Sequence, residues 1–175
     1  MKMRRMILLA SLAIGLLAGD LEELRASIKT QNVKGNFTQT KILSGFDKPF
    51  KSYGSFALKD DELLWDTSRP IVSHVVINKE GIFQKNGKDL VKTSQNFDEG
   101  LFLSMVKLDT NELEKEFDIK FEGDIKKGWR IALEPKNLLL KQIFTQISIF
   151  GDKFVRKIEL YEVSGDKTIN EFEIK

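Results

Sequence analysis

The 175-residue chain contains no cysteine and only one histidine, His74. Without cysteine there is no disulfide scaffold, no thiolate zinc site, no cysteine nucleophile and no lipid-modified N-terminal cysteine. A single histidine leaves carboxylates as the only other common metal ligands. The sequence also has no nucleotide-binding, metalloprotease or serine-hydrolase motif. We therefore expect no cofactor and no metal site.

Two features could still indicate catalysis, His74 and the acidic run 60–62. On the predicted strand 71–79, Ser73 and His74 alternate to opposite faces, so they do not form a nucleophile and base pair. We interpret the acidic run as a solvated hairpin turn rather than a calcium or carboxylate site. The prediction is a protein with no catalytic residues. A carboxylate enzyme is the alternative, which a buried carboxylate pair in a cleft would favour.

Long apolar runs are restricted to the N-terminus. Residues 6–18 form an apolar run of thirteen residues that follows Lys2, Arg4 and Arg5. Such a run is short for a bilayer span and typical of a secretory signal, so we predict a signal peptide over residues 1–19. An uncleaved anchor is the alternative, because a leucine stands three positions before the cleavage site, where a small residue is preferred. Export to an oxidising periplasm agrees with the lack of cysteine.

Neither sign of charge is in clear excess after this leader. Without its three basic residues, 25 Lys and Arg remain against 26 Asp and Glu. No clustered basic face is visible, so we expect no nucleic-acid partner. Residues 20–175 are enough for one domain with a single core, and we predict a monomer.

Alternation of apolar and polar residues dominates this domain and predicts about ten antiparallel strands. We expect them at residues 33–43, 50–59, 63–68, 71–79, 82–87, 117–125, 128–135, 142–150, 154–163 and 168–174. Gly-Asp pairs at 123–124, 151–152 and 165–166 indicate hairpin turns. Helical spacing occurs in residues 20–31, with Asp20 as a possible cap, and in residues 96–117, with Asp98 and Glu99 near the start.

Phenylalanine is abundant, with thirteen residues. Several fall on strand positions of one parity: Phe37, Phe56, Phe83, Phe117 and Phe121. A sheet with one apolar face must cover that face, and two helical segments are little cover for ten strands. The sheet either curls and fills its interior or holds a cavity for a hydrophobic ligand. Periodicity alone favours the filled core and leaves the cavity open. We expect Trp129 to be a core residue.

Motifs in the first half of the domain occur in a recognisable order. They are VKGNFTQTK with Phe37 and Gln39, SYGSFAL with Gly54, Phe56 and Leu58, LLWDTSRP with Trp65 and Pro70, and INKEGIF with Gly81. This succession resembles the LolA-type periplasmic carriers of outer-membrane lipoproteins. Farther on, the segment 137–149 resembles the strand that the family forms around Lys141, Gln142 and Ile143, and residues 154–174 resemble its final hairpin.

The resemblance implies a mainly β (α+β) fold, an unclosed and strongly curved antiparallel half-barrel of about eleven strands. Helices would cover the concave face as a lid, and acyl chains would bind between sheet and lid. By position, the lipid-binding cavity would include Phe37, Phe56, Leu58, Leu63, Trp65, Val76 and Phe83, and the lid Leu24, Leu101, Phe102 and Met105. For Trp65, Phe102 and Met105, an ordinary core role is the alternative. The implied partners are an acylated lipoprotein or lipid cargo, an inner-membrane lipoprotein-releasing transporter and an outer-membrane acceptor.

The sequence also departs from the family pattern. Well-known members have an Arg-Pro pair shortly before the tryptophan, and that arginine latches the lid. Here the only Arg-Pro pair, Arg69-Pro70, follows Trp65, and the chain ends directly after its last strand. LolA-like carriers for glycolipid or aryl-polyene lipid export are therefore an alternative, as is a periplasmic interaction module with a collapsed core. The family's outer-membrane acceptor, LolB, is a lipoprotein, which the lack of cysteine argues against.

Overall fold

The computed structural model describes residues 21–28, 30, 32–87, 89–93 and 99–175. The predicted signal peptide and the predicted helix starts at Asp20 and Asp98 lie outside the described residues. None of the helices in the described part combines the length and apolar character that crossing a membrane requires.

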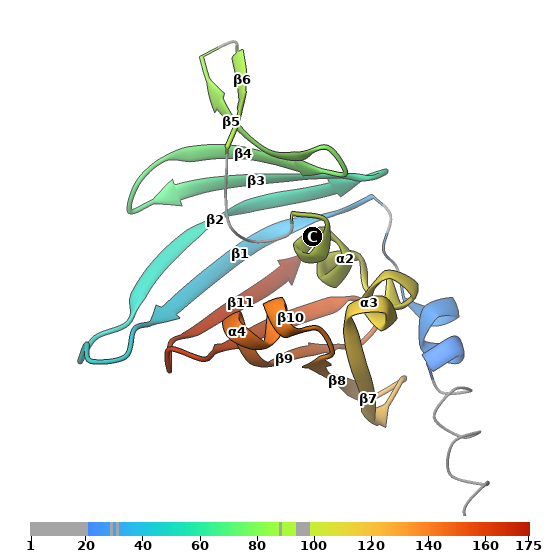
Figure 1. The fold of residues 1–175 in the computed structure, drawn as a ribbon. Coiled ribbons are helices and arrows are strands. Elements are labelled where there is room, and N and C mark those ends of the chain that lie inside the picture. Colours follow the sequence, from blue (N-terminus) through green and yellow to red (C-terminus); the bar gives the residue numbers. More distant parts are fainter. Residues whose placement is uncertain (1–20, 29, 31, 88, 94–98) are drawn as a thin grey trace, which may run out of the picture.

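Eleven antiparallel strands in the described residues form one sheet (Figure 1). They are β1 Val33–Ile42, β2 Phe50–Lys59, β3 Glu62–Arg69, β4 Ser73–Asn78, β5 Gly81–Asn86, β6 Asp89–Lys92, β7 Phe117–Asp124, β8 Gly128–Pro135, β9 Phe144–Gly151, β10 Val155–Glu162 and β11 Lys167–Ile174. Their order is β6-β5-β4-β3-β2-β1-β11-β10-β9-β8-β7. The first and last strands pair in the middle, while β6 and β7 remain as edges, so the sheet is open. The fold class expected from the sequence is confirmed.

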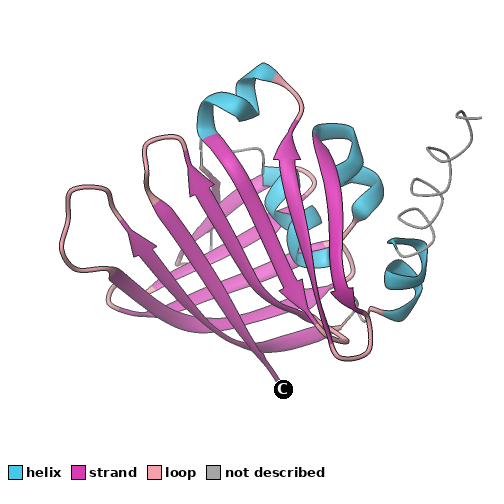
Figure 2. Cartoon of the chain, turned by 90° about the horizontal axis from the view of Figure 1, so that it is seen from below, coloured by secondary structure: helices cyan, strands magenta, loops and turns pink. Residues whose placement is uncertain are grey.

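The helices lie on the concave side of this curved sheet (Figure 2). They are α2 Glu99–Lys107, α3 Thr110–Glu116 and α4 Leu138–Ile143, and residues 21–27 are also helical. Helix α2 contacts β4 and β5 from one half of the sheet and β10 from the other. It therefore crosses the concave space and joins the two halves of the sheet.

One continuous apolar core lies between the sheet and these helices. On the sheet side it contains fully buried residues such as Leu63, Leu133 and Ile147, and Met105 of α2 is also fully buried. Trp129 is 3% exposed, as predicted for a core residue, and its indole Nε1 donates to the Asp152 carbonyl at 2.7 Å.

The N-terminal helix is fixed by both apolar and polar contacts. Leu24 is fully buried in the core, and Arg25 donates to the Thr110 hydroxyl and pairs with Glu114 of α3 at 3.4 Å. Polar contacts and burial together attach this helix to the domain.

The strand prediction for 142–150 is wrong at its start. Lys141, Gln142 and Ile143 belong to α4, and β9 begins only at Phe144. The side chain of Asn137 caps this helix by accepting the Leu140 N–H at 2.8 Å, and burial of Leu140 fixes its orientation. This local cap outweighs the strand propensity of the residues that follow.

Strand β6 was not predicted. All four of its residues are exposed, and it pairs only with β5 at the edge of the sheet. Without a buried face it has no apolar alternation that could reveal it.

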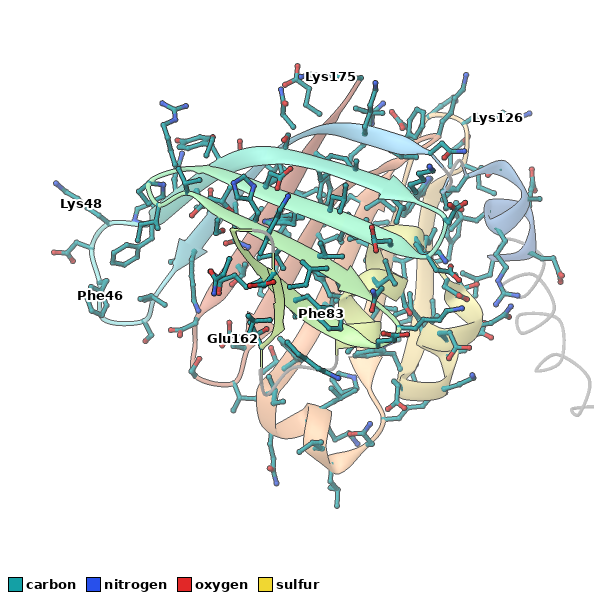
Figure 3. The ribbon with its side chains drawn as sticks, turned by 90° about the horizontal axis from the view of Figure 1, so that it is seen from above. Phe46, Lys48, Phe83, Lys126, Glu162 and Lys175 are labelled. Carbon is teal, nitrogen blue, oxygen red and sulfur yellow. The ribbon has the colours of Figure 1, made fainter. Side chains whose placement is uncertain are left out.

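The connection between the long strands β1 and β2 projects beyond the sheet, and Phe46 and Lys48 lie on it (Figure 3).

Candidate functional site

A cavity of about 500 Å³ lies on the concave side of the sheet. Strands β1, β3, β4, β5, β10 and β11 contribute to its wall, together with helix α2 and the junction of α4 with β9. The lining residues are Gln39, Lys41, Trp65, Thr67, Ser73, Val75, Ile77, Ile82, Phe102, Ile143, Phe144, Leu160, Glu162, Thr168 and Asn170. Helices thus cover part of the apolar face of the sheet and leave another part open. Side chains therefore do not completely fill the space between the sheet and the helices.

Strand register decides which residues face the cavity. Trp65 pairs with Val75, and Ile77 pairs with Ile82, so these residues share one face of the sheet. All four line the cavity. Side chains alternate along a strand, so the residues between them point to the outer face.

An aromatic cluster surrounds Trp65. Its ring stacks on Phe37 with 3.8 Å between centroids, and it meets Phe172 edge-on at 6.1 Å. Phe102 of α2 also contacts it edge-on at 5.7 Å. Trp65 thus connects strands β1, β3 and β11 to the helix that covers them.

Gly54 makes room for this cluster. A Cβ at residue 54 would lie 2.6 Å from the Phe37 ring and 2.1 Å from the Asp66 carbonyl oxygen. The glycine in the SYGSFAL motif is therefore required by the close approach of Phe37 and the neighbouring strand.

The predicted cavity and lid residues fall into three groups. Trp65 and Phe102 line the cavity. Buried in the apolar core are Phe37, Phe56, Leu58, Leu63, Leu24, Leu101 and Met105. Of these, Phe37 is packed directly behind Trp65, and Leu101 and Met105 hold α2 against the sheet.

Val76 and Phe83 form the third group, and the structure does not bring them into the cavity. They pair with each other, and Val76 also pairs with Leu64, one residue out of phase with Trp65 and Ile82. Both are half-buried on the outer face. Their assignment to the cavity is corrected, because a shift of one residue along a strand changes the face.

Polar lining residues were not predicted from the sequence. Gln39 and Asn170 are directly paired on β1 and β11, and Lys41 and Thr168 form the next pair on the same face. Gln39 Nε2 donates to Asn170 Oδ1 at 2.9 Å, while Asn170 Nδ2 is buried without a partner among the described residues. A buried unpaired donor costs about 1–3 kcal/mol. The sequence signal that could have identified Asn170 as a lining residue is its position between Thr168 and Phe172 on one face of the last strand.

The arginine that follows Trp65 lies on the outer face of the sheet. The Arg69 guanidinium is 5.0 Å from the centre of the Tyr53 ring, and Tyr53 precedes Gly54, which faces Phe37 on the concave side. Helix α2 is instead tied to the turn between β2 and β3, where Lys107 pairs with Asp61.

The acidic run 60–62 is exposed, as predicted. Hydrogen bonds from Lys107 and Lys79 lower the pKa of Asp61 to about 2. In the described residues, no three His, Asp or Glu side chains come together as a metal site would require. His74 is also exposed, on the outer face, with its Nδ1 2.8 Å from Asp66 Oδ1.

Comparison with known proteins agrees with this architecture. The family model described as "Outer membrane lipoprotein carrier protein LolA" matches residues 28–174. No curated protein sequence matches the chain.

The solved structures that are similar to the chain over most of its length include the following two. MucB shares 17% identity over 90% of this chain and 58% of that chain, with a TM-score of 0.51. A LolA superfamily protein from Nitrosomonas europaea shares 8% identity over 91% of this chain and 92% of that chain, with a TM-score of 0.46. Since the family model spans nearly all of the described sheet and helices, the chain belongs to the LolA family of outer membrane lipoprotein carrier proteins.

Proposed function

We propose that this protein shields the acyl chains of lipoproteins, or of another acylated lipid, during transfer from the inner to the outer membrane. The observation behind this proposal is the open cavity next to the aromatic cluster around Trp65. Its volume of about 500 Å³ lies within the range of about 300–1,000 Å³ that small-molecule sites occupy.

The energetics of acyl transfer support this assignment. Burial of a methylene contributes about 0.8 kcal/mol, so one sixteen-carbon chain contributes on the order of 10 kcal/mol. A chain of that length does not cross water unaccompanied at a useful rate. Apolar side chains such as Val75, Ile77 and Ile82 offer the acyl chain a surface without polar groups that would need hydrogen-bond partners.

The open cavity counts against an interaction module with a collapsed core. A carboxylate enzyme is also disfavoured, because Glu162 is the one acidic residue among the described residues that line the cavity. We infer a non-enzymatic carrier, consistent with the carrier function in the family's name.

Location and partners follow from the same proposal. The apolar leader over residues 1–19 would direct the chain to the periplasm. There the donor would be an inner-membrane lipoprotein-releasing transporter and the recipient an outer-membrane acceptor. A carrier of glycolipid or aryl-polyene lipids would have the same cavity and different partners.

Native mass spectrometry of the protein purified from its own periplasm, with lipid extraction, tests the carrier function. We expect a co-purifying acylated species, and its head group separates a lipoprotein from a glycolipid cargo. A ligand-free mass that does not shift when acylated lipopeptide or fatty acid is added would contradict the proposal.

A further inference from the structure

Among the described residues, the lining of the cavity includes one buried side-chain donor without a hydrogen-bond partner. Asn170, at the centre of β11, is 1% exposed and lines the cavity. Its neighbours in register are Gln39 on β1 and Ile158 on β10, which places its side chain on the concave face.

The hydrogen bonds of this amide can be counted. Its Oδ1 accepts from Gln39 Nε2 at 2.9 Å, so its Nδ2 points away from Gln39. Its Nδ2 is buried and has no acceptor in the described part of the protein. Buried polar groups in folded proteins are nearly always paired, so an amide left with free donors in a cavity indicates that a ligand supplies the acceptor.

The surroundings of Asn170 restrict the chemistry of that acceptor. The apolar side of the cavity begins at Trp65, whose ring meets Phe172, the next residue of β11 on the same face. On the other side, the pair of Lys41 and Thr168 follows, and Lys41 is exposed. Asn170 therefore lies where an apolar wall meets a polar stripe that leads toward solvent.

A neutral acceptor fits this position better than a charged one. A buried carboxylate needs a cation as partner, and the only cation among the described lining residues is the exposed Lys41. An ester or amide carbonyl at the end of an acyl chain is neutral, accepts hydrogen bonds and is continuous with an apolar tail. A free fatty acid would instead place its carboxylate toward Lys41.

We propose that the cavity binds an acyl chain together with its ester or amide carbonyl, which accepts a hydrogen bond from Asn170 Nδ2. This inference rests on the carrier function proposed above and adds the chemical class of the cargo. The tail lies against Trp65 and Val75, and the head group follows the polar stripe toward Lys41.

The test compares two ligands that differ in the carbonyl group alone, 1-palmitoylglycerol and its ether analogue 1-O-hexadecylglycerol. We expect the wild-type protein to bind the ester about tenfold more tightly, as one hydrogen bond in a buried site predicts. In Asn170→Leu the ratio of the two dissociation constants falls to about one. Thr38→Val removes a polar group of β1 on the outer face of the sheet and leaves the ratio unchanged.

If both ligands bind the wild-type protein equally and Asn170→Leu changes neither, the Asn170 amide holds only water. That result overturns this inference and leaves the carrier function intact. If neither ligand binds, the carrier function fails and the inference fails with it. Should Asn170→Leu not fold, the ratio in the wild-type protein decides, together with the side-chain ¹⁵N–¹H resonances of Asn170. A shift of these resonances with the ester and not with the ether supports the bond, and equal responses contradict it.

Discussion

Trp65 is the residue at which the sheet and its covering helix meet. Its ring contacts Phe37, Phe172 and Phe102, which come from β1, β11 and α2. Aromatic pairs of this kind contribute about 0.5–1.5 kcal/mol beyond the area they bury. Because one edge of the cluster lines the cavity, the same contacts that stabilise the fold also shape the binding surface.

Adjacent residues of β4 provide a sharp test of this surface. Val75 lines the cavity, whereas Val76, also half-buried, lies on the outer face. We expect Val75→Asp to weaken binding of a fluorescent fatty acid at least about 100-fold, since an ion moved out of water costs several kcal/mol. Val76→Asp should retain wild-type binding. Equal effects of the two changes in a fluorescence titration would show that the cavity is not the binding site.

Helix α2 is the element that closes the concave side. Its buried residues Leu101, Leu103 and Met105 pack into the core, while Phe102 turns toward the cavity and Trp65. The ion pair of Lys107 with Asp61 holds its C-terminal end to the turn between β2 and β3. Helix α2 thus has one side that packs into the core and another side that faces the cavity.

This division predicts different effects for two neighbouring substitutions. Phe102→Ala removes a half-buried ring from the cavity wall and should speed release of a fluorescent fatty acid to vesicles, at a stability cost of about 1–3 kcal/mol. Leu103→Ala, in the core, should cost about 2–5 kcal/mol and leave the release rate unchanged. Stopped-flow release and urea unfolding measure the two quantities. Faster release in Leu103→Ala alone would reverse the assignment.

The outer face of β10 and β11 contains a buried carboxylate network. Glu159 is 7% exposed and accepts from Lys157 at 2.8 Å, Lys167 at 3.1 Å and the Tyr161 hydroxyl at 2.5 Å. Burial by itself would raise the pKa of Glu159, but these hydrogen bonds lower it from 4.5 to about 2. The carboxylate therefore stabilises the fold in its charged form.

The direction of this pKa shift determines how the stability of the fold changes with pH. A pKa that is lower in the folded state stabilises the protein above pH 4.5, and the contribution is lost as the pH falls toward 2. We expect Glu159→Gln to lower the free energy of unfolding by about 2 kcal/mol at pH 7, with a difference from wild type that shrinks below pH 4.5. Urea unfolding at several pH values measures it. Glu173→Gln, an exposed change on the same face, is the control, and a difference that does not vary with pH would contradict the network.

At the scale of the whole molecule, the sheet is open and has two edges. The edge strand β7 has exposed charged residues at alternate positions, Asp118, Lys120, Glu122 and Asp124, and the other edge strand, β6, has only four residues. Charged and short edge strands resist pairing with another chain. The curved sheet can therefore expose a concave cavity without also exposing an edge that pairs readily with another chain.

We expect a monomer in sedimentation velocity at all concentrations tested, both free and loaded with lipid. Lys120→Val combined with Glu122→Val should introduce concentration-dependent association through β7. A stable wild-type dimer would mean that an edge or the cavity mouth is occupied by a second copy.

Local patterns in the sequence were sufficient for much of the fold. The alternation in residues 33–41 placed Phe37 and Gln39 on one face, and both do point to the concave side. Helical spacing located α2 and α3, and the ordered motifs around Phe56 and Trp65 indicated the family from the sequence alone. These features depend on residues close in the chain, which is why a periodic pattern reveals them.

Only the tertiary structure decided the site. Whether Val75 or Val76 faces inward depends on a register that a one-residue shift would reverse, and the cap that turns residues 138–143 into a helix outweighs their strand propensity. The cavity itself is set by curvature and by the position of α2, and Asn170 meets Gln39 across 131 residues of sequence. Alternation along one strand specifies two faces, but the contacts between distant strands determine which face is concave and how much of it stays uncovered.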